Sequence, residues 1–439
     1  MGAFVARHRL EGSIYRIIFG FAAIIAGAAV STAAPAVVLG AEQQLGKSLF
    51  FDKGLSHGGS QSCASCHSPT VAFTDPDSSH ATSKGDNPAL FGNRNAPSAM
   101  YMAYSPTFHY DTDEQLYIGG QFTDGRAPTL EEQAKAPFLN PVEMGNSNRA
   151  EVVDHLMSGP NADAFKSVYG ADAFNNVDKA YDNISNAIAS YERSPELSPF
   201  TSKFDYSLKG RVVLSPSEKR GLAAFNDPMK GGCSGCHIST PGADGTPPLF
   251  TDFTYDNIGI PKNMASDFLT LPAEFNPDGT AFTDLGLGGI VADPSLYGAF
   301  KVTTLRNIAL TGPYGHNGYF TTLSQIITFY ATRDAWPTCA DPSTSAANAF
   351  AMGCWPSAEF ADTMNRDELG NLNLSAGDIR DIKAFLATLT DGYAGVVPEP
   401  KNWAMLIAGF ALVGGRMRSV RRRARVDLIQ IDAYPAPRT

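Results

Sequence analysis

The sequence of 439 residues has no apolar run long enough to cross a membrane comfortably, since a spanning helix needs about 20 apolar residues. Two short runs, at 17–30 and 403–413, lie near its ends. Three arginines precede the first run, and Ala34-Pro35-Ala36 after it fits the pattern of a signal-peptide cleavage site. We therefore expect residues 1–36 to be a cleaved signal peptide and the protein to be exported. An uncleaved N-terminal anchor is the alternative.

Positive charge is scarce in the body of the chain. The whole chain has a net charge of −10. Residues 1–36 contribute +2 and residues 401–439 contribute +6, so residues 37–400 alone carry −18. A body this acidic is unsuited to holding nucleic acid through phosphate contacts. It would instead attract a basic partner.

Strand patterns are short and scattered, whereas helical patterns recur at 182–194, 215–225 and 375–389. We expect Ser217 to cap the second helix, and Ser375 with Asp378 to form a capping box at the third. The content of 43% hydrophobic and 18% charged residues suits a folded protein, and 41 Gly and 29 Pro predict long loops. The sequence thus predicts a mostly α body with little β and a domain boundary near residues 202–210.

Cysteine is also scarce, and all six residues fall into patterns. Four lie in "CASCH" (63–67) and "CSGCH" (233–237). Cys339 and Cys354 remain as one pair. In an exported protein, a pair that closes a short loop predicts a disulfide. Two free thiols are the alternative.

The C-x-x-C-H units predict covalent attachment of haem. The two thiols of each unit, Cys63 with Cys66 and Cys233 with Cys236, would add to the vinyl groups of one haem. The adjacent His67 or His237 would then reach the iron as proximal ligand. A zinc site with four cysteine ligands is the competing interpretation. The histidine after each pair, the separation of the pairs and the expected export favour haem.

A loose repeat accompanies the two units. "GKSLFFD" (46–52) precedes Cys63 and "GLAAFND" (221–227) precedes Cys233, and both follow the pattern G-x-x-x-F-x-D. Such a repeat predicts two related domains.

A further helix is predicted in "YGHNGYFTTLSQIITFY". Leu323, Ile326, Ile327 and Tyr330 lie on one helical face, and Thr322 is placed to cap it. The face is apolar apart from the Tyr330 hydroxyl. From this pattern alone, Tyr330 is either a core residue with a hydroxyl to satisfy or a functional phenol.

The order of motifs resembles the bacterial di-haem cytochrome c peroxidase and MauG family. The matching stretches are "LFFDKGLSHGGSQSCASCHSPTVAFTD", "GNRNAPSAM", "FTDGRAPTLEEQAKAPFLNPVEMGN", "GGCSGCH" and "LRNIALTGPYGHNGYFTTL", which lie between residues of about 45 and 390. The resemblance implies two cytochrome c-like haem domains, a peroxide-reacting one at 41–205 and an electron-transfer one at 206–393. It also implies hydrogen peroxide as substrate, two covalently bound haem c groups and a small basic donor, such as a cytochrome or cupredoxin. A homodimer is compatible with it.

The resemblance assigns roles to single residues. Glu143 matches a glutamate over the N-terminal haem, and Gln133 matches a glutamine in the same pocket. A carboxylate there could move a proton between the two peroxide oxygens. Asn95 and the carbonyls of Thr311 and Pro313 match a calcium site between the domains. Without the resemblance, Glu143 would be a solvated acid and Asn95 a turn residue.

Three positions depart from the family pattern. Asp86 stands where activated peroxidases have a removable histidine, and His80 is nearby but out of register. Thr123 replaces the tryptophan that lies between the haems, and Tyr117, Phe122 or another aromatic residue could substitute for it. Tyr330 stands where peroxidases carry an axial Met and MauG proteins an axial Tyr, so we expect it to ligate the second iron.

The C-terminal region, 396–425, joins Pro-Glu-Pro to a short apolar run and an arginine cluster. It resembles the PEP-CTERM sorting signal read by exosortases in Gram-negative bacteria, although the tail beyond the arginines is longer than that pattern. The resemblance implies a periplasmic or envelope location, with membrane contact only through this segment. A simple tail anchor is the alternative.

Three functions are compatible with these features. The first is a peroxidase that reduces hydrogen peroxide with electrons entering through the C-terminal haem. The second is a MauG-like enzyme that uses peroxide to oxidise side chains of a partner protein. The third is a non-enzymatic electron carrier, against which Glu143 and Gln133 argue.

Overall fold

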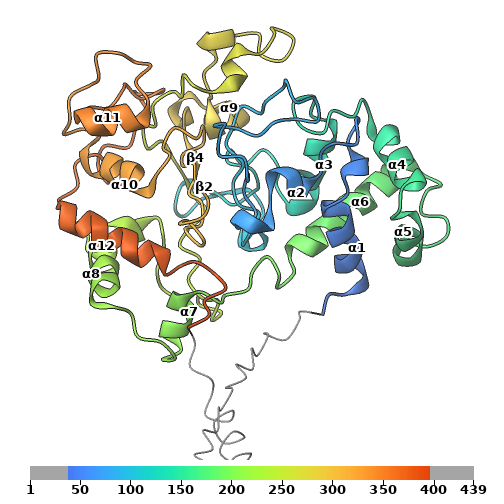
Figure 1. Cartoon of the computed structure of the whole chain (residues 1–439), viewed down its shortest axis with the longest axis horizontal. Helices are drawn as coiled ribbons and strands as arrows, with labels where there is room; N and C mark the ends of the chain where they lie inside the picture. The colour runs from blue at the N-terminus through green and yellow to red at the C-terminus, as the bar shows by residue number, and fades with distance from the viewer. Residues whose placement is uncertain (1–37, 396–439) are drawn as a thin grey trace, which may run out of the picture. The chain divides into compact units, whose positions relative to one another are not determined.

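Helices dominate the part of the chain that the computed structural model describes, residues 38–395 (Figure 1). The expected signal peptide and sorting segment lie outside these residues. The α-helices are α1 (Ala41–Phe50), α2 (Cys63–Cys66), α3 (Leu130–Leu139), α4 (Arg149–Ser158), α5 (Ala162–Tyr169), α6 (Val177–Glu192), α7 (Lys203–Leu208), α8 (Pro216–Asn226), α9 (Gly286–Val291), α10 (Leu323–Thr332), α11 (Ala346–Met352) and α12 (Ala376–Ala387). None of them is long and apolar enough to span a bilayer.

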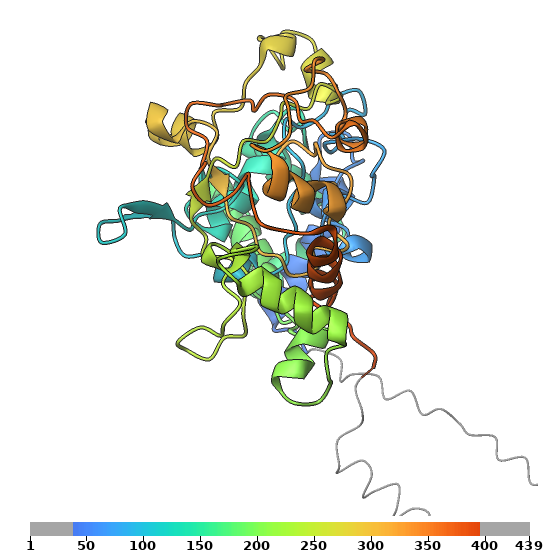
Figure 2. The ribbon, with the colours of Figure 1, turned by 90° about the vertical axis from the view of Figure 1, so that its left-hand side faces the viewer.

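The described residues contain only two small sheets. β1 (His109–Asp111) pairs antiparallel with β2 (Leu116–Ile118), and Tyr110 lies opposite Tyr117. The resulting hairpin projects from the surrounding loops in Figure 2. β3 (Tyr255–Asp256) pairs antiparallel with β4 (Phe300–Lys301). The prediction of a mostly α fold with little β is therefore confirmed.

The loose sequence repeat corresponds to two similar helix crossings. α1 packs on α6, and α8 packs on α12 (Figure 1). At the first crossing, a Cβ on Gly46 would lie 1.8 Å from the carbonyl oxygen of Ala187. At the second, a Cβ on Gly221 would lie 1.9 Å from the carbonyl oxygen of Asp381. Glycine at the first position of each repeat thus lets the two backbones touch.

The phenylalanine of each repeat fills the core beneath its crossing. Phe50 packs edge-on against Tyr191 of α6, and Phe225 packs against Phe385 of α12. All four rings are buried. The repeated residues therefore build the same helix pair twice, each just before a C-x-x-C-H unit.

Buried apolar residues form two large clusters. The first draws its buried members from Leu45 to Leu197 and the second from Phe204 to Leu389. A small third cluster joins Leu90, Phe91 and Val142 to residues 268–271. The assignment of haem domains to 41–205 and 206–393 remains a prediction, although the described residues from Leu39 onward belong to one compact unit.

The helix N-termini show where sequence patterns were sufficient. The caps at Thr322 and Ser375 are confirmed, each as part of a capping box. The expectation for Ser217 is wrong, because Ser215 caps α8 and Pro216 occupies its first turn. Proline suits that position because an N–H in the first turn has no acceptor within the helix, so proline loses no hydrogen bond there. Ser217 instead donates a hydrogen bond to Asp381 of α12.

Candidate haem sites

The two C-x-x-C-H units hold their histidines in the same way. In the first, α2 ends at Cys66, and His67 Nδ1 lies 3.1 Å from the carbonyl oxygen of Phe73. In the second, His237 Nδ1 lies 2.9 Å from the carbonyl oxygen of Phe250. A backbone acceptor on Nδ1 fixes the ring and leaves Nε2 for a metal. Burial lowers the pKa of both imidazoles, which favours the neutral, ligating form.

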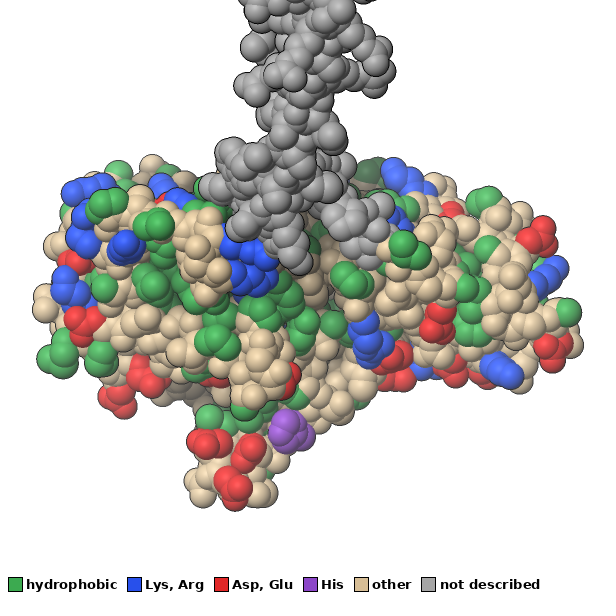
Figure 3. Space-filling view, turned by 90° about the horizontal axis from the view of Figure 1, so that it is seen from below, with side chains coloured by type: hydrophobic (Ala, Val, Ile, Leu, Met, Phe, Trp, Pro, Cys, Tyr) green, Lys and Arg blue, Asp and Glu red, His purple; other side chains and the backbone are tan. Residues whose placement is uncertain are grey.

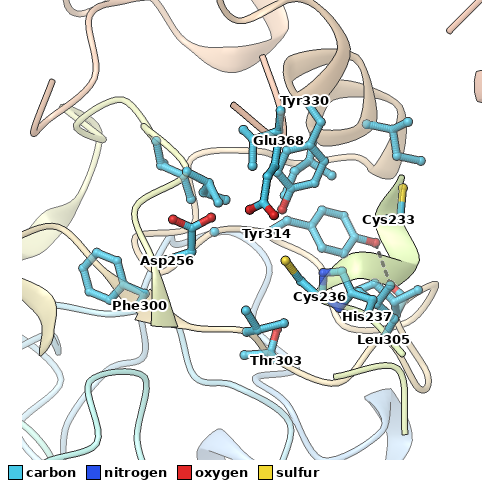
Figure 4. A pocket seen from close by; sticks show the side chains of 18 of the residues that line it. Cys233, Cys236, His237, Asp256, Phe300, Thr303, Leu305, Tyr314, Tyr330 and Glu368 are labelled. Atoms are coloured by element: carbon cyan, nitrogen blue, oxygen red, sulfur yellow. Dashed lines mark hydrogen bonds between the residues drawn. The ribbon is translucent and has the colours of Figure 1, made fainter. Parts of the chain in front are cut away.

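A cavity of about 770 Å³ adjoins the second unit. Cys233, Cys236 and His237 line one side of it, and Tyr330 enters from α10 (Figure 4). Its volume lies in the range of cofactor pockets, about 300–1,000 Å³. In Figure 4, the Tyr330 side chain points from its helix toward the side of the cavity that carries Cys236 and His237. Cys233, Cys236 and His237 would hold a covalently attached haem here, and Tyr330 lines the same cavity.

The Tyr330 phenol lies in a site that disfavours its anion. Burial raises its pKa, and the charge of Asp256 adds to the effect. An anionic phenolate here therefore requires a positive charge close to its oxygen. A ferric iron is such a charge.

The residues expected over the first haem come from α3 and the turn after it. Gln133 lies half-buried on the helix, and the backbone N–H of Glu143 donates to the carbonyl oxygen of Asn140 at 3.0 Å. Burial raises the pKa of the Glu143 carboxyl, although Arg126 opposes this. Burial and then neighbouring charges, including that of Glu143, raise the pKa of the Cys66 thiol to about 12. Glu143 is thus a half-buried carboxyl whose charge reaches the haem-attachment cysteine Cys66.

The Asp86 carboxylate is hydrogen-bonded to a neighbouring loop, residues 56–60. Its carboxylate accepts hydrogen bonds from Ser56 Oγ at 2.8 Å, from the Gly58 backbone at 2.7 Å and from Ser60 Oγ at 2.7 Å. Burial raises its pKa, but these hydrogen bonds outweigh that effect and hold the pKa below its usual value. Asp86 therefore anchors residues 56–60.

His80 is held by a residue far along the chain. Its Nδ1 lies 2.7 Å from Asp267 Oδ2, and its ring lies 4.9 Å from that of Phe91. These contacts occupy both the edge and the face of the imidazole. They give His80 a role in joining residues 80–91 to the loop around Asp267.

Glu192 is a buried carboxyl that motif searching did not find. It is 6% exposed at the end of α6, and its Oε2 has no hydrogen-bond partner among the described residues. Burial raises its pKa to about 8, and its charge contributes to the raised pKa of Cys63. Its burial could have been predicted from helical periodicity, because Glu192 follows Ile184 and Ile188 on the same buried face of α6.

The replacement of the expected tryptophan leaves a polar residue in the same cavity. Thr123 is buried, lines the cavity, and has no hydrogen-bond partner for Oγ1 within residues 38–395. Phe300 and His316 also line this cavity, with their rings stacked at 3.7 Å. Neither Tyr117 nor Phe122, the two aromatic residues named from the sequence, lines this cavity. The stacked pair comes from the second half of the chain, so only the fold reveals it.

Two charged residues, Asp284 and Lys301, line the cavity together with Thr123. Arg94 pairs with Asp284 and with Asp124, at 2.6 Å each. Lys301 is buried and donates from Nζ to the carbonyl oxygen of Gly120 at 2.7 Å. Burial lowers the pKa of Lys301 to about 7, although Asp124 opposes the effect. Arg94 and Asp284 are 190 residues apart, so no local sequence pattern predicts their pairing.

The residues expected to bind calcium lie together. Asn95 Nδ2 donates to the carbonyl oxygen of Pro313 at 2.7 Å. Asn95, Thr311 and Pro313 all line the cavity described above. Amide and backbone oxygens are the ligands that calcium prefers. The predicted disulfide is confirmed: it joins Cys339, which follows α10, to Cys354, which follows α11.

Comparison with known proteins connects these sites to a family. The family profile described as di-haem cytochrome c peroxidase matches residues 40–212. Methylamine utilization protein MauG from Paracoccus denitrificans is 38% identical over 356 residues, which cover 79% of this chain and 88% of that protein. Cytochrome c551 peroxidase from Pseudomonas aeruginosa is 34% identical over 286 residues, which cover 63% of this chain and 68% of that protein.

A solved structure agrees with these matches. The diheme peroxidase BthA from Burkholderia thailandensis is 33% identical, with a TM-score of 0.67 over 81% of this chain and 88% of that one. The expected resemblance is thus confirmed, and the interpretation as a non-enzymatic electron carrier is not retained. The chain belongs to the di-haem cytochrome c peroxidase and MauG family, and it is a peroxidase-like, peroxide-dependent oxidoreductase with two haem groups.

Proposed function

We propose that the protein reduces hydrogen peroxide to water at its N-terminal haem, with electrons that enter through the C-terminal haem. Each peroxide takes up two electrons and two protons, its O–O bond breaks, and two molecules of water leave. Cys63, Cys66 and His67 would hold the haem, which would supply the electron-transfer chemistry at this site. The observation that carries the proposal is the half-buried Glu143 carboxyl, whose charge acts on Cys66.

Glu143 gives this site a group that can move protons. Its raised pKa brings the carboxyl closer to the working pH, where one group can both accept and release a proton. It would take the proton from one peroxide oxygen and return it to the other. Gln133 would hold the peroxide by hydrogen bonds from the same side.

Charge supports a small basic protein, such as a cytochrome or a cupredoxin, as the electron donor. Residues 37–400 carry a net charge of −18. The tip of the projecting β1–β2 hairpin exposes Asp113 and Glu114. On the face shown in Figure 3, acidic side chains gather at the projecting lower end. Opposite charges would speed the encounter of the two proteins, most strongly at low salt.

The test is the variant Glu143→Gln, which keeps the shape of the side chain and removes the proton-carrying group. We expect the rate of peroxide reduction to fall by about 10²–10⁴-fold, with haem content unchanged. Rapid mixing of the reduced protein with peroxide, followed by haem absorbance, measures it. Glu132→Gln on the exposed face of α3 is the matched control and should react as the unaltered protein does. Full activity of Glu143→Gln would remove Glu143 from the mechanism.

A second candidate function is oxidation of side chains on a partner protein, as in the MauG type. It is supported by Tyr330 in the C-terminal cavity and by the 38% identity to a MauG protein. Thr123 argues against it, because no indole lies at that position. Incubation with peroxide and without an electron donor separates the candidates, since only the second predicts that oxidising equivalents are stored rather than turned over.

Further features of the protein belong to the same proposal. Asn95, Thr311 and Pro313 would bind a calcium ion between the haem domains. The domains would extend over 41–205 and 206–393. The protein would be exported to the periplasm or cell envelope of a Gram-negative bacterium, and residues 396–425 would sort it there.

A further inference from the structure

A series of touching aromatic rings leads from the C-terminal cavity to the protein surface. It begins at Tyr330, which lines the cavity, and passes to Phe329, whose ring centre is 6.4 Å away. Phe329 meets Trp355 at 5.3 Å, and Trp355 stacks on Trp336 at 5.4 Å with an angle of 14° between the ring planes. The last ring, Phe350, lies 6.5 Å from Trp336.

Tryptophan is rare in this protein, and two of its residues belong to this series. The sequence contains three tryptophans, and the third, Trp403, lies outside the described residues. Indole and phenol are the side chains most easily oxidised by one electron. The stacked indoles therefore put the most oxidisable side chains of the described chain between the cavity and solvent.

The inner and outer ends of the series differ in exposure. Phe329 is fully buried and Trp355 is 2% exposed, so both belong to the second hydrophobic cluster. Trp336 is half-buried at the margin of that cluster. Beside it, α11 exposes Phe350 (39%) and Met352 (62%). Core packing accounts for the inner rings, but it does not require the series to continue to an apolar patch in solvent.

The backbone holds the two indoles in place. Trp355 Nε1 donates to Thr332 Oγ1 at 3.0 Å, at the end of the helix that carries Tyr330. Its backbone N–H donates to the carbonyl oxygen of Pro337 at 3.2 Å. The disulfide between Cys339 and Cys354 joins the two segments that carry Trp336 and Trp355. The series is therefore built from one helix and one covalently closed loop.

We propose that Trp336 and Trp355 form an electron-transfer route between the C-terminal haem site and the surface patch of Trp336, Phe350 and Met352, and that neutral phenols are oxidised at this patch. The proposal rests on the proposed peroxide-reducing function. A phenol ring matches the patch, because it can stack on Trp336 and Phe350 and carries no charge to desolvate. The protein would then take electrons from two kinds of donor, a small basic protein and a neutral phenol.

The chemistry of this route balances with peroxide as the oxidant. Each phenol loses one electron to Trp336 and its hydroxyl proton to water, and becomes a phenoxyl radical. Two phenols supply the two electrons that one peroxide needs. The O–O bond breaks, two protons are taken up, and two molecules of water form.

The test compares Trp336→Phe with the unaltered holoprotein, using 2-methoxyphenol as the aromatic donor and ferrocyanide as a second, inorganic donor. Phenylalanine keeps a stacked ring but is much harder to oxidise. We expect peroxide-dependent oxidation of the phenol to fall by about an order of magnitude or more, while reduction of peroxide by ferrocyanide is unchanged. Tyr110→Phe, on the exposed hairpin strand β1, is the control that alters an exposed aromatic ring elsewhere.

A second measurement does not depend on turnover. When peroxide is added without any donor, electrons should be withdrawn from the ring series itself. Peptide mass spectrometry should then find oxygen added to Trp336, and added 2-methoxyphenol should prevent this. In Trp336→Phe the oxygen should appear on Trp355 instead.

The outcomes separate the two proposals. If the protein consumes peroxide with ferrocyanide, but Trp336→Phe oxidises the phenol at the unaltered rate and Trp336 gains no oxygen, the route is wrong and the proposed function stands. If no donor supports peroxide reduction, the proposed function is wrong and the route, which depends on it, is overturned as well.

Discussion

At the scale of single residues, Tyr330 illustrates what a sequence pattern can and cannot decide. Helical spacing put its hydroxyl on an apolar face, but spacing alone favoured a core residue. The structure places the side chain in the cavity that Cys233, Cys236 and His237 line. Burial raises the pKa of the phenol, so a role as an anionic ligand depends on a charge supplied by iron.

Replacement of Tyr330 by Met tests that role. A thioether stabilises ferrous iron, whereas a phenolate favours ferric and higher states. We therefore expect Tyr330→Met to raise the reduction potential of one haem and to leave the other unchanged, as measured by spectroelectrochemical titration. Tyr314→Phe is the matched control, because Tyr314 lines the same cavity but donates its hydroxyl hydrogen to the carbonyl oxygen of Ile308. Unchanged potentials in Tyr330→Met would make Tyr330 a core residue.

Residues recognised from local motifs were easier to predict than residues defined by distant partners. The C-x-x-C-H units carry their chemistry in five consecutive positions, so His67 and His237 could be named at once. Asp86 could not be interpreted in this way, because its hydrogen-bond donors lie 26 to 30 residues earlier in the sequence. The same holds for the pair of Arg94 and Asp284, which are 190 residues apart.

At the scale of helices, the repeat G-x-x-x-F-x-D describes a crossing rather than a ligand site. Its glycine marks where two backbones meet, and its phenylalanine fills the space below. The sequence predicted the helix at 215–225 almost to its limits, since the structure has Pro216–Asn226. It also predicted the helix at 375–389, which the structure has as α12, but not that α8 packs on α12, because that contact depends on residues about 160 positions apart.

Gly221→Ala tests the second crossing. The added methyl group would lie 1.9 Å from the Asp381 carbonyl oxygen, and α8 and α12 would have to separate. Overpacking of this kind costs about 1–3 kcal/mol of unfolding free energy, which chemical denaturation of the holoprotein measures.

The control for this substitution is Gly377→Ala in the first turn of α12. There the new Cβ would meet only Ser375 Oγ at 3.4 Å and Arg380 Nη2 at 3.8 Å, which are ordinary contacts. We expect this variant to be as stable as the unaltered protein or slightly more stable, since alanine favours helix over glycine. Equal losses in both variants would mean that the crossing is not the cause.

At the scale of the whole described chain, the two hydrophobic clusters are joined by polar contacts between residues far apart in sequence. Tyr101 of the first cluster donates its hydroxyl hydrogen to Asp391 Oδ2 at 2.7 Å. Asn307 donates to the same carboxylate at 2.9 Å. The resemblance to a two-haem family predicted two halves, but single residues gave no indication of how the halves are held together.

Arg306 is the centre of this junction. Its guanidinium pairs with Asp205 at 2.9 Å, and both side chains are fully buried. The same guanidinium lies over the rings of Tyr101, at 4.9 Å, and Phe200, at 4.5 Å. One cation of the second half therefore touches aromatic residues of the first half and neutralises Asp205, which lies at the boundary between the halves. A buried charge of this kind tolerates the loss of its partner poorly.

We expect Arg306→Met to lower the unfolding free energy by about 3–5 kcal/mol, because it leaves the Asp205 carboxylate buried and unpaired. Calorimetry of the holoprotein should also show the unfolding transition broadening or splitting, since the cation no longer bridges the halves. The double variant Arg306→Met with Asp205→Asn removes the unpaired charge and should recover part of the stability but not the single transition.

The control is Arg193→Met, which breaks only the partly exposed pair with Glu131 and should cost at most about 1 kcal/mol. A single transition at unaltered stability in Arg306→Met would show that the apolar contacts between the halves suffice, and that Arg306 contributes no net stability to their junction.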